Sequence, residues 1–198
     1  MPDSTLSFAE TSGDHALDRL LFGRIVALAA SGDRPLTREL GLPADDITAL
    51  IRRHVPQAAA LLADPTKLGS GAGSGEIEEA DLRAFILEHR GHQEIEAEWL
   101  AAIIARRAMG PNHLWQDMGF ADRGELNAMF LRHFPALKAR NAQDMKWKKF
   151  FYRSLCEREG LLLCKSPHCE ICDDFVDCFG AEPGDPLSTL AHLSRQEA

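Results

Sequence analysis

The chain has 198 residues, 45% hydrophobic and 26% charged, which is the ordinary balance of a folded globular protein and excludes a disordered one. Its 22 Lys and Arg residues face 30 Asp and Glu residues, and the net charge of −8 argues against nucleic acid as the main partner. The first residues lack the pattern of a secretory signal and no apolar run could span a bilayer, so we expect a cytoplasmic protein without membrane contact.

The predicted elements are helices throughout. After a flexible start at residues 1–14, apolar residues at helical spacing predict a helix over 15–30, within an N-terminal helical part that covers 15–66. No segment sustains period-two alternation, so the predicted fold class is all-α. A main helical part, residues 76–162, contains predicted helices over 76–90, 92–109, Asp122 to His133, and Asp144 to Glu159.

Two segments are predicted to lack regular structure. The sequence GSGAGSG, residues 69–75, offers no side chains that would hold an ordered shape, so residues 67–75 are predicted to form a flexible linker between the two helical parts. The tail, residues 181–198, is predicted to be loosely held.

Residues 35–56 resemble residues 113–135. In both segments a short helix, a Gly turn and a second helix are followed by the motif Arg-His-x-Pro. The similarity predicts a helical bundle built from two similar helical hairpin units, with chance reuse of a hairpin core as the alternative. His54 and His133 end the two units, where a histidine favours the helix dipole.

Four of the five cysteines lie in a predicted irregular loop, residues 163–180, with the spacing C-x4-C-x2-C-x5-C. In a reducing compartment clustered thiols indicate a metal site before disulfides. Four thiolates suit an iron–sulfur cluster or a tetrahedral zinc ion. Only one C-x2-C pair is present, and the C-x4-C-x2-C portion matches a spacing that wraps an iron–sulfur cluster.

Three segments resemble those of a known family: PNHLWQDMGF (111–120), RNAQDMKWKKFFYRSLC (140–156) and LCKSPHCEICDDFVDCFG (163–180). In this order they are similar to the NifQ family of molybdenum-dependent nitrogen fixation. The resemblance implies a metallocluster carrier rather than an enzyme. It implies that the chain binds a molybdenum–iron–sulfur cluster and donates molybdenum for assembly of the nitrogenase iron–molybdenum cofactor.

The resemblance also implies specific ligands and partners. The implied partners are the NifEN scaffold and the nitrogenase iron protein, with molybdate as the metal source. The implied cluster ligands are Cys164, Cys169, Cys172 and Cys178. The sequence leaves open a non-thiolate ligand of molybdenum, for which the candidates are His113, His133 and His168.

Residues 138–153 concentrate six basic side chains and several aromatic ones. The basic residues predict either a solvated helix face or a docking patch for an acidic partner or for molybdate. The aromatic residues are mostly expected in the core, and Cys156 is interpreted as a small buried hydrophobe. The basic residues are Lys138, Arg140, Lys146, Lys148, Lys149 and Arg153, and the aromatic ones are Trp147, Phe150, Phe151 and Tyr152.

Three functions from other classes stay open at this point. An iron–sulfur regulator that senses oxygen or redox state would need a DNA-reading helix with a basic face, which the net charge disfavours. A zinc-stapled interaction module would lose its fold under chelation. An electron-transfer ferredoxin would leave most of the helical chain without a role.

Overall fold

The computed structural model describes residues 12–73, 75, 77–160 and 175–191. These residues form helices and contain no strand, which confirms the predicted all-α fold class. Within the same residues, no helix is both long and apolar enough to cross a membrane.

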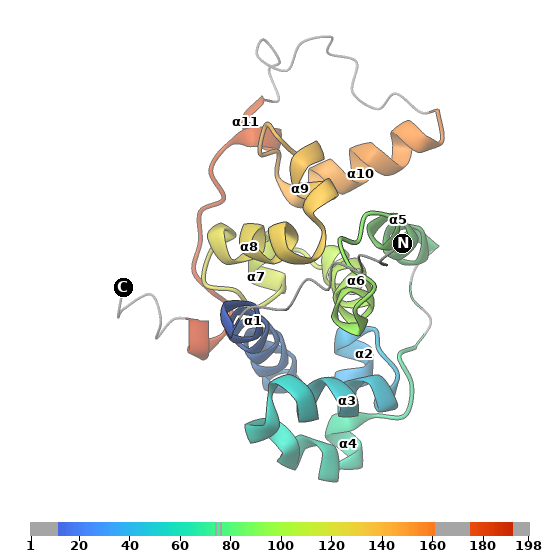
Figure 1. Cartoon of the computed structure of the whole chain (residues 1–198), viewed down its shortest axis with the longest axis vertical. Coiled ribbons are helices and arrows are strands. Elements are labelled where there is room, and N and C mark those ends of the chain that lie inside the picture. Colours follow the sequence, from blue (N-terminus) through green and yellow to red (C-terminus); the bar gives the residue numbers. More distant parts are fainter. Residues whose placement is uncertain (1–11, 74, 76, 161–174, 192–198) are drawn as a thin grey trace, which may run out of the picture.

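The helices before the Gly/Ser segment begin with one long helix and continue with short ones (Figure 1). They are α1 (Ser12–Ser31), α2 (Leu36–Leu40), α3 (Ala44–His54), the 3-10 helix η1 (Pro56–Ala63) and α4 (Pro65–Leu68). The predicted helix over 15–30 corresponds to α1 and is therefore confirmed.

The helices after this segment include the predicted ones and three short additions. They are α5 (Ile77–Glu88), α6 (Ile95–Ala108), α7 (Leu114–Asp117), α8 (Arg123–His133), α9 (Pro135–Arg140), α10 (Trp147–Arg158) and α11 (Phe175–Phe179). The side chain of Asp122 accepts a hydrogen bond from the amide of Glu125 at 3.0 Å, as expected of an N-cap that begins α8.

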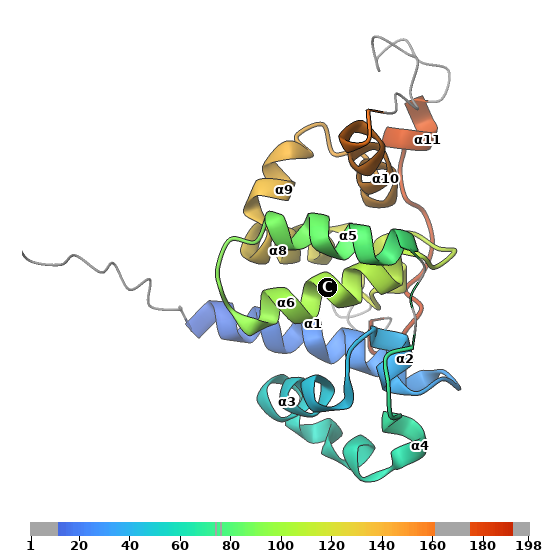
Figure 2. The ribbon, with the colours of Figure 1, turned by 90° about the vertical axis from the view of Figure 1, so that its right-hand side faces the viewer.

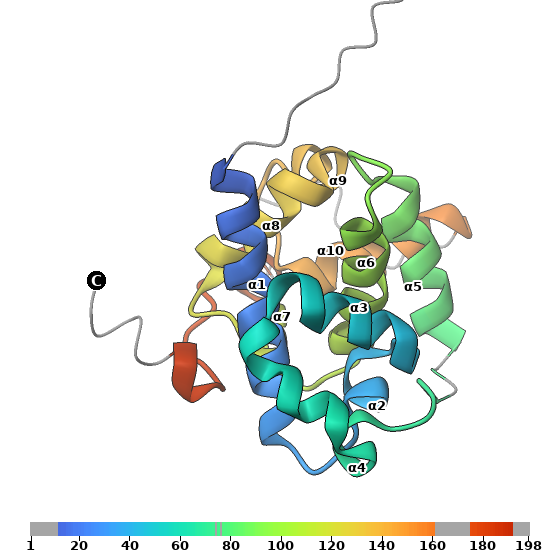
Figure 3. The ribbon, with the colours of Figure 1, turned by 60° about the horizontal axis from the view of Figure 1, so that its bottom comes forward.

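One hydrophobic core extends from Leu21 in α1 to Phe151 in α10. Figure 1 shows α3 and α4 at one end of the molecule and α10 with α11 at the other. Helices α5 and α6 lie side by side as an antiparallel pair (Figure 2), and α1 contacts α2, α3 and α8 (Figure 3). The Gly/Ser segment therefore connects two parts of a single core. It runs against α6, where Arg106 donates hydrogen bonds to the carbonyl of Ala72 at 3.2 Å.

The hairpins α2–α3 and α7–α8 share local conformations at aligned positions. Gly41 and Gly119 have φ angles of 66° and 80°, the left-handed region that favours glycine. Val55 and Phe134 end the second helices with nearly equal dihedral angles, φ −134° and ψ 49° against φ −136° and ψ 55°. A helix that starts with proline follows in both cases. These matches support the prediction of two similar hairpin units.

Helix α10 begins at Trp147, three residues later than the sequence predicts. Asp144 has a φ angle of 58°, which no helix accommodates. The side chain of Asn141 closes this turn, because it accepts the amide of Met145 and donates to the Met145 carbonyl, both at 2.8 Å. Local side-chain bonds of this kind compete with a helical start.

The aromatic residues of α10 fill the core as expected. Trp147 stacks on Phe130 with ring centroids 3.6 Å apart, and Phe150 and Phe151 are buried. Tyr152 is the exception, because 62% of it is exposed.

The structure corrects the predicted irregular loop over 163–180 at its end, because residues 175–179 form α11. Phe175 and Phe179 are four residues apart and stack at 4.9 Å, a spacing that only a helical turn provides.

Part of the tail also differs from expectation. Ser188 and Ala191 are buried, and Arg24 donates to the carbonyl of Leu190 at 2.6 Å. Residues 181–191 thus lie against the bundle rather than loosely.

Candidate metal centre

Cys178 is the predicted thiolate that the structure places. It lies in α11, is half-buried, and packs against the hydrophobic core. Cys164, Cys169, Cys172 and His168 lie outside the described residues. In the part of the chain that is described, no group of three or more His, Cys, Asp or Glu side chains could hold a metal ion.

The segment around Cys178 is fixed to the start of α10. The backbone amide of Lys146 donates to the carbonyl of Cys178 at 2.7 Å, and Lys146 Nζ donates to the carbonyl of Val176 at 3.1 Å. Helix α10 ends at Arg158, and its 12 residues span about 18 Å. The chain therefore leaves α10 at its C-terminal end, and Cys178 is bonded to the residue before its N-terminal end.

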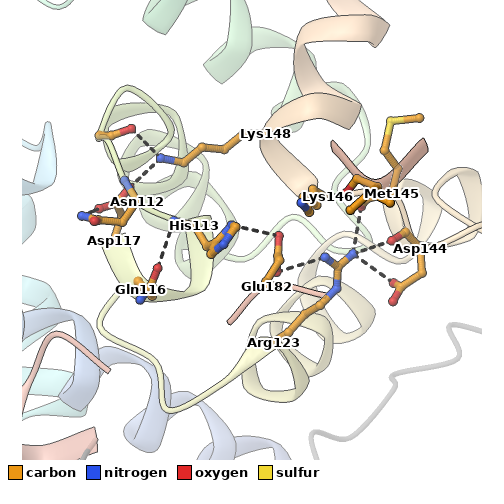
Figure 4. A network of polar contacts seen from close by, with 12 residues as sticks. Asn112, His113, Gln116, Asp117, Arg123, Asp144, Met145, Lys146, Lys148 and Glu182 are labelled. Atoms are coloured by element: carbon orange, nitrogen blue, oxygen red, sulfur yellow. Dashed lines mark hydrogen bonds and ion pairs between the residues drawn. The ribbon is translucent and has the colours of Figure 1, made fainter. Parts of the chain in front are cut away.

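A buried carboxylate fixes the chain just after Cys178. Glu182 is 5% exposed, and its Oε2 lies 3.0 Å from Arg123 Nη1, while its Oε1 lies 3.6 Å from His113 Nδ1 (Figure 4). Arg123 Nη2 also donates to the carbonyls of Asp144 and Met145, both at 2.8 Å. One guanidinium thus joins the segment after the cysteines to the turn before α10.

A second polar contact ties α7 to α10. Asp117 accepts hydrogen bonds from Lys148 Nζ at 2.5 Å and from Asn112 Nδ2 at 2.9 Å (Figure 4). Lys148 Nζ also donates to the carbonyl of Gly110 at 2.7 Å. A Cβ atom at Gly110 would lie 2.6 Å from the Asp117 carboxylate, so this close approach requires glycine.

The contacts of Lys146, Lys148 and Arg123 bring together three segments that are far apart in the sequence: 111–120, 140–156 and the end of 163–180. The NifQ family model matches residues 21–180, a range that contains all three segments. The chain belongs to the NifQ family.

Individual members of the NifQ family are similar over most of their length. Protein NifQ of Azotobacter vinelandii is 35% identical over 193 residues, which cover 91% of this chain and 95% of the relative. Protein NifQ of Rhodobacter capsulatus is 40% identical over 153 residues, 77% of this chain and 82% of the relative. Protein NifQ of Klebsiella pneumoniae is 35% identical over 156 residues, 76% and 90% of the two chains. No solved structure matches.

The two described histidine candidates of this NifQ-family chain have different surroundings. His113 begins α7, and its side chain is 29% exposed beside Glu182. His133 is 2% exposed, and its Nε2 lies 2.8 Å from Oδ1 of Asp18. Because Nε2 of His133 is hydrogen-bonded to Asp18, this contact, and not only the helix dipole, explains the position of His133. Whether either histidine binds molybdenum stays a prediction.

The contact of His133 with Asp18 has a counterpart in the other hairpin. Arg132 and His133 both bind Asp18, with Arg132 Nη2 at 2.8 Å. In the same way Glu96 Oε1 lies 2.6 Å from Arg53 Nε and 3.0 Å from His54 Nε2. The repeated Arg-His motif therefore binds one buried carboxylate in each hairpin.

The protonation of both carboxylates reflects these contacts. Burial by itself raises the pKa of Asp18, but hydrogen bonds from His133 and Arg132 outweigh it and hold the pKa far below its usual value of 3.8. Burial likewise opposes ionisation of Glu96, and the hydrogen bond from His54 with the charge of Arg53 lowers its pKa below 4.5. Both groups are therefore carboxylates at neutral pH.

Sequence reasoning missed both carboxylates, although a signal existed. Asp18 lies three, four and seven residues before Leu21, Phe22 and Ile25, on the apolar stripe of α1. Glu96 has the same spacing to Trp99, Leu100 and Ile103 in α6. A carboxylate on an apolar stripe requires a buried partner.

The basic residues of 138–153 are mostly engaged within the chain. Five of the six contact other groups: Lys138 contacts Asp144, Arg140 contacts His89, Lys146 contacts Val176, Lys148 contacts Asp117 and Arg153 contacts Glu157. Lys149 is exposed. These contacts favour a structural role for the segment over a docking patch or a DNA-reading face.

Proposed function

We propose that this chain is a metallocluster carrier that binds a molybdenum–iron–sulfur cluster and donates its molybdenum to assembly of the nitrogenase iron–molybdenum cofactor. The proposed cluster ligands are Cys164, Cys169, Cys172 and Cys178. One observation carries the proposal: a four-thiol segment with iron–sulfur spacing lies within the range matched by the NifQ family, and the backbone of its last cysteine is bonded to Lys146 on the core.

The contacts around Cys178 suit a ligand that must keep its position while a cargo enters and leaves. The backbone carbonyl of Cys178 accepts a hydrogen bond from Lys146. Four residues after Cys178, Glu182 pairs with Arg123. Thiolates bind iron and molybdenum together, so four of them hold a cluster with few other ligands. A half-buried thiol is shielded on one side and open on the other, which permits transfer to a partner.

The proposed partners are the NifEN scaffold, which receives the molybdenum, and the nitrogenase iron protein, with molybdate as the original source. We propose that the chain acts in the cytoplasm, where thiols stay reduced. In this account the cluster is cargo, and the chain itself performs no catalytic turnover.

A transfer assay tests this function. Anoxically loaded protein is incubated with molybdenum-free NifEN, the iron protein and a reductant, and the molybdenum on re-isolated NifEN is measured. Cys178→Ser is compared with Cys156→Ser, because Cys156 is a half-buried thiol in α10 outside the proposed ligand set. We expect transfer from wild type and Cys156→Ser, and none from a folded Cys178→Ser. Equal transfer from both variants would contradict the ligand assignment.

We also propose that α2–α3 and α7–α8 are two copies of one helical hairpin unit. The matching glycine turns and helix ends support this, as does the shared binding of a buried carboxylate by Arg-His. A designed exchange of the two Gly turns, residues 41–43 and 119–121, tests it by thermal unfolding. A folded exchange variant is expected, and loss of the fold would count against equivalence of the units.

A further inference from the structure

A pocket rich in arginine lies between α2 and the C-terminal end of α6, outside the cysteine segment. Its cavity volume is about 370 Å³, and four arginines line it together with three carboxylates. This volume is at the lower end of the roughly 300–1,000 Å³ of small-molecule sites. The arginines are Arg34, Arg38, Arg106 and Arg107.

Arg107 lines this pocket and has donors without a partner among the described residues. Its Nη1 donates to Glu39 at 2.7 Å, and its side chain is only 14% exposed. Its Nε and Nη2 atoms are buried and have no hydrogen-bond partner among the described residues. Burial lowers the pKa of Arg107, and Glu39 only partly offsets this. Buried donors without acceptors are costly, so the site favours a ligand that supplies acceptor oxygens.

The charges around the pocket are unbalanced in favour of cations. Each lining carboxylate has a basic partner: Glu39 has Arg107 and, at 3.4 Å, Arg34, whereas Glu79 has Arg106 at 2.8 Å and Asp117 has Lys148 at 2.5 Å. Arg38 is exposed, and its side chain makes no ion pair within the described residues. Four arginines thus line the pocket with three carboxylates, and Lys148 neutralises one of these, Asp117, from outside the lining. With Lys148 included, the local charge is +2.

We propose that this pocket binds a small tetrahedral dianion through Arg38 and Arg107, and that its ligand is molybdate held before incorporation into the cluster. The identification of molybdate rests on the proposed function, whereas the dianion site rests on the pocket alone. Guanidinium groups present paired donors that match tetrahedral oxyanions. Two excess charges match a dianion.

The start of α10 contacts both the pocket and the cysteine segment. Lys148 binds Asp117 in the pocket wall (Figure 4). The backbone amide of Lys146 donates to the carbonyl of Cys178. Only one residue separates these two lysines. An anion held in the pocket would therefore lie near the start of α10, to which the last proposed cluster ligand is also bonded.

Equilibrium dialysis of the full chain without its cluster, under anoxic conditions, tests the proposal. The probes are molybdate, sulfate and phosphate, and bound molybdenum is measured by mass spectrometry. Arg107→Lys keeps a cation for Glu39 but removes the two unused donors, and Arg38→Gln removes an exposed guanidinium with little expected effect on folding. Lys149→Gln, another exposed cation, is the matched control.

We expect one molybdate per chain, with affinity about tenfold or more lower in Arg107→Lys and Arg38→Gln. The affinity of Lys149→Gln is expected to equal that of wild type. Absence of binding, or binding that both arginine variants retain, would overturn the site. Equal competition by sulfate or phosphate would support a dianion site and overturn molybdate as its ligand.

Cluster content separates this inference from the proposed function. Cys169→Ala is expected to lose the cluster and to keep molybdate binding. If the wild type binds molybdate but never carries a molybdenum–iron–sulfur cluster, the carrier function fails and the pocket stands. If the cluster loads normally in a chain that binds no oxyanion, the pocket fails and the carrier function stands.

Discussion

The backbone amide of Lys146 lies 2.7 Å from the carbonyl oxygen of Cys178 and donates a hydrogen bond to it. This bond joins the residue before α10 to the last proposed cluster ligand, 32 positions later in the sequence. It makes the folded core, rather than the cysteine segment alone, responsible for the position of that ligand. In a carrier built in this way, the folded core fixes the position of one cluster ligand.

Replacement of Lys146 tests whether this backbone hydrogen bond holds Cys178 in place. Lys146 has a φ angle of −51°, which proline accommodates, so Lys146→Pro removes the amide donor with little strain. A hydrogen bond contributes about 1 kcal/mol, so we expect roughly fivefold faster loss of iron to a chelator. Lys146→Met is the control, because it removes Nζ and keeps the amide. Equal rates for the proline and methionine variants would contradict a role for this bond.

Glu182 is expected to hold the segment after Cys178 on the bundle. In Glu182→Gln the half-buried Arg123 loses one of its two carboxylate partners and keeps Asp144, at a cost of about 1–3 kcal/mol. Hydrogen exchange over residues 181–191 is predicted to accelerate. The exposed pair of Glu157 with Arg153 offers the comparison, because Glu157→Gln should change exchange there very little. If neither variant exchanged faster than wild type over residues 181–191, Glu182 would not hold this segment on the bundle.

The two buried carboxylates are predicted to be large contributors to stability. Removing one partner of a buried ion pair costs about 3–5 kcal/mol, so Asp18→Asn should lower the free energy of unfolding by this order. Glu96→Gln should cost less, because its partner Arg53 is half exposed. Urea unfolding measures the change. Glu88→Gln, in an exposed pair with Arg158, should cost less than about 1 kcal/mol. A loss at Asp18→Asn as small as that of Glu88→Gln would contradict this prediction.

The same carboxylates predict how stability depends on pH. Their pKa values are lowered in the folded chain from 3.8 for Asp18 and 4.5 for Glu96, so the unfolded chain binds protons first. Their contribution is fully present above about pH 5 and is lost as the pH falls through and below these unfolded values. Unfolding measured from pH 7 to pH 3 should show this loss, with a shallower slope in Asp18→Asn. An equal slope in that variant would contradict the assignment.

The sequence predicts the helices well because their signal is local. Apolar spacing and caps place α1 and α8 within a few residues. The start of α10 is missed because the Asn141 side chain closes a turn there, which no periodicity reports. The order in residues 181–191 is missed because its partners, such as Arg24, lie far away in the sequence.

The candidate site also has a part that the sequence predicts and a part that only the fold reveals. Cysteine spacing alone predicts a metal, since the ligand set is contiguous. The contacts that hold this segment could not be predicted, because Lys146 reaches Cys178 and Arg123 reaches Glu182 only through the fold. The role of the basic segment is ambiguous in the sequence for the same reason: Lys146 and Lys148 donate to backbone carbonyls, and Lys148 also to the distant Asp117, which composition does not reveal.

Metal and sulfide content of anoxically purified protein tests the central claim most directly, with wild type measured beside Cys178→Ser and Cys156→Ser. The account predicts iron, sulfide and molybdenum together in wild type and Cys156→Ser, and loss of all three in a folded Cys178→Ser. A colourless wild type with a single zinc ion, or a Cys178→Ser variant with unchanged iron and molybdenum, would contradict it.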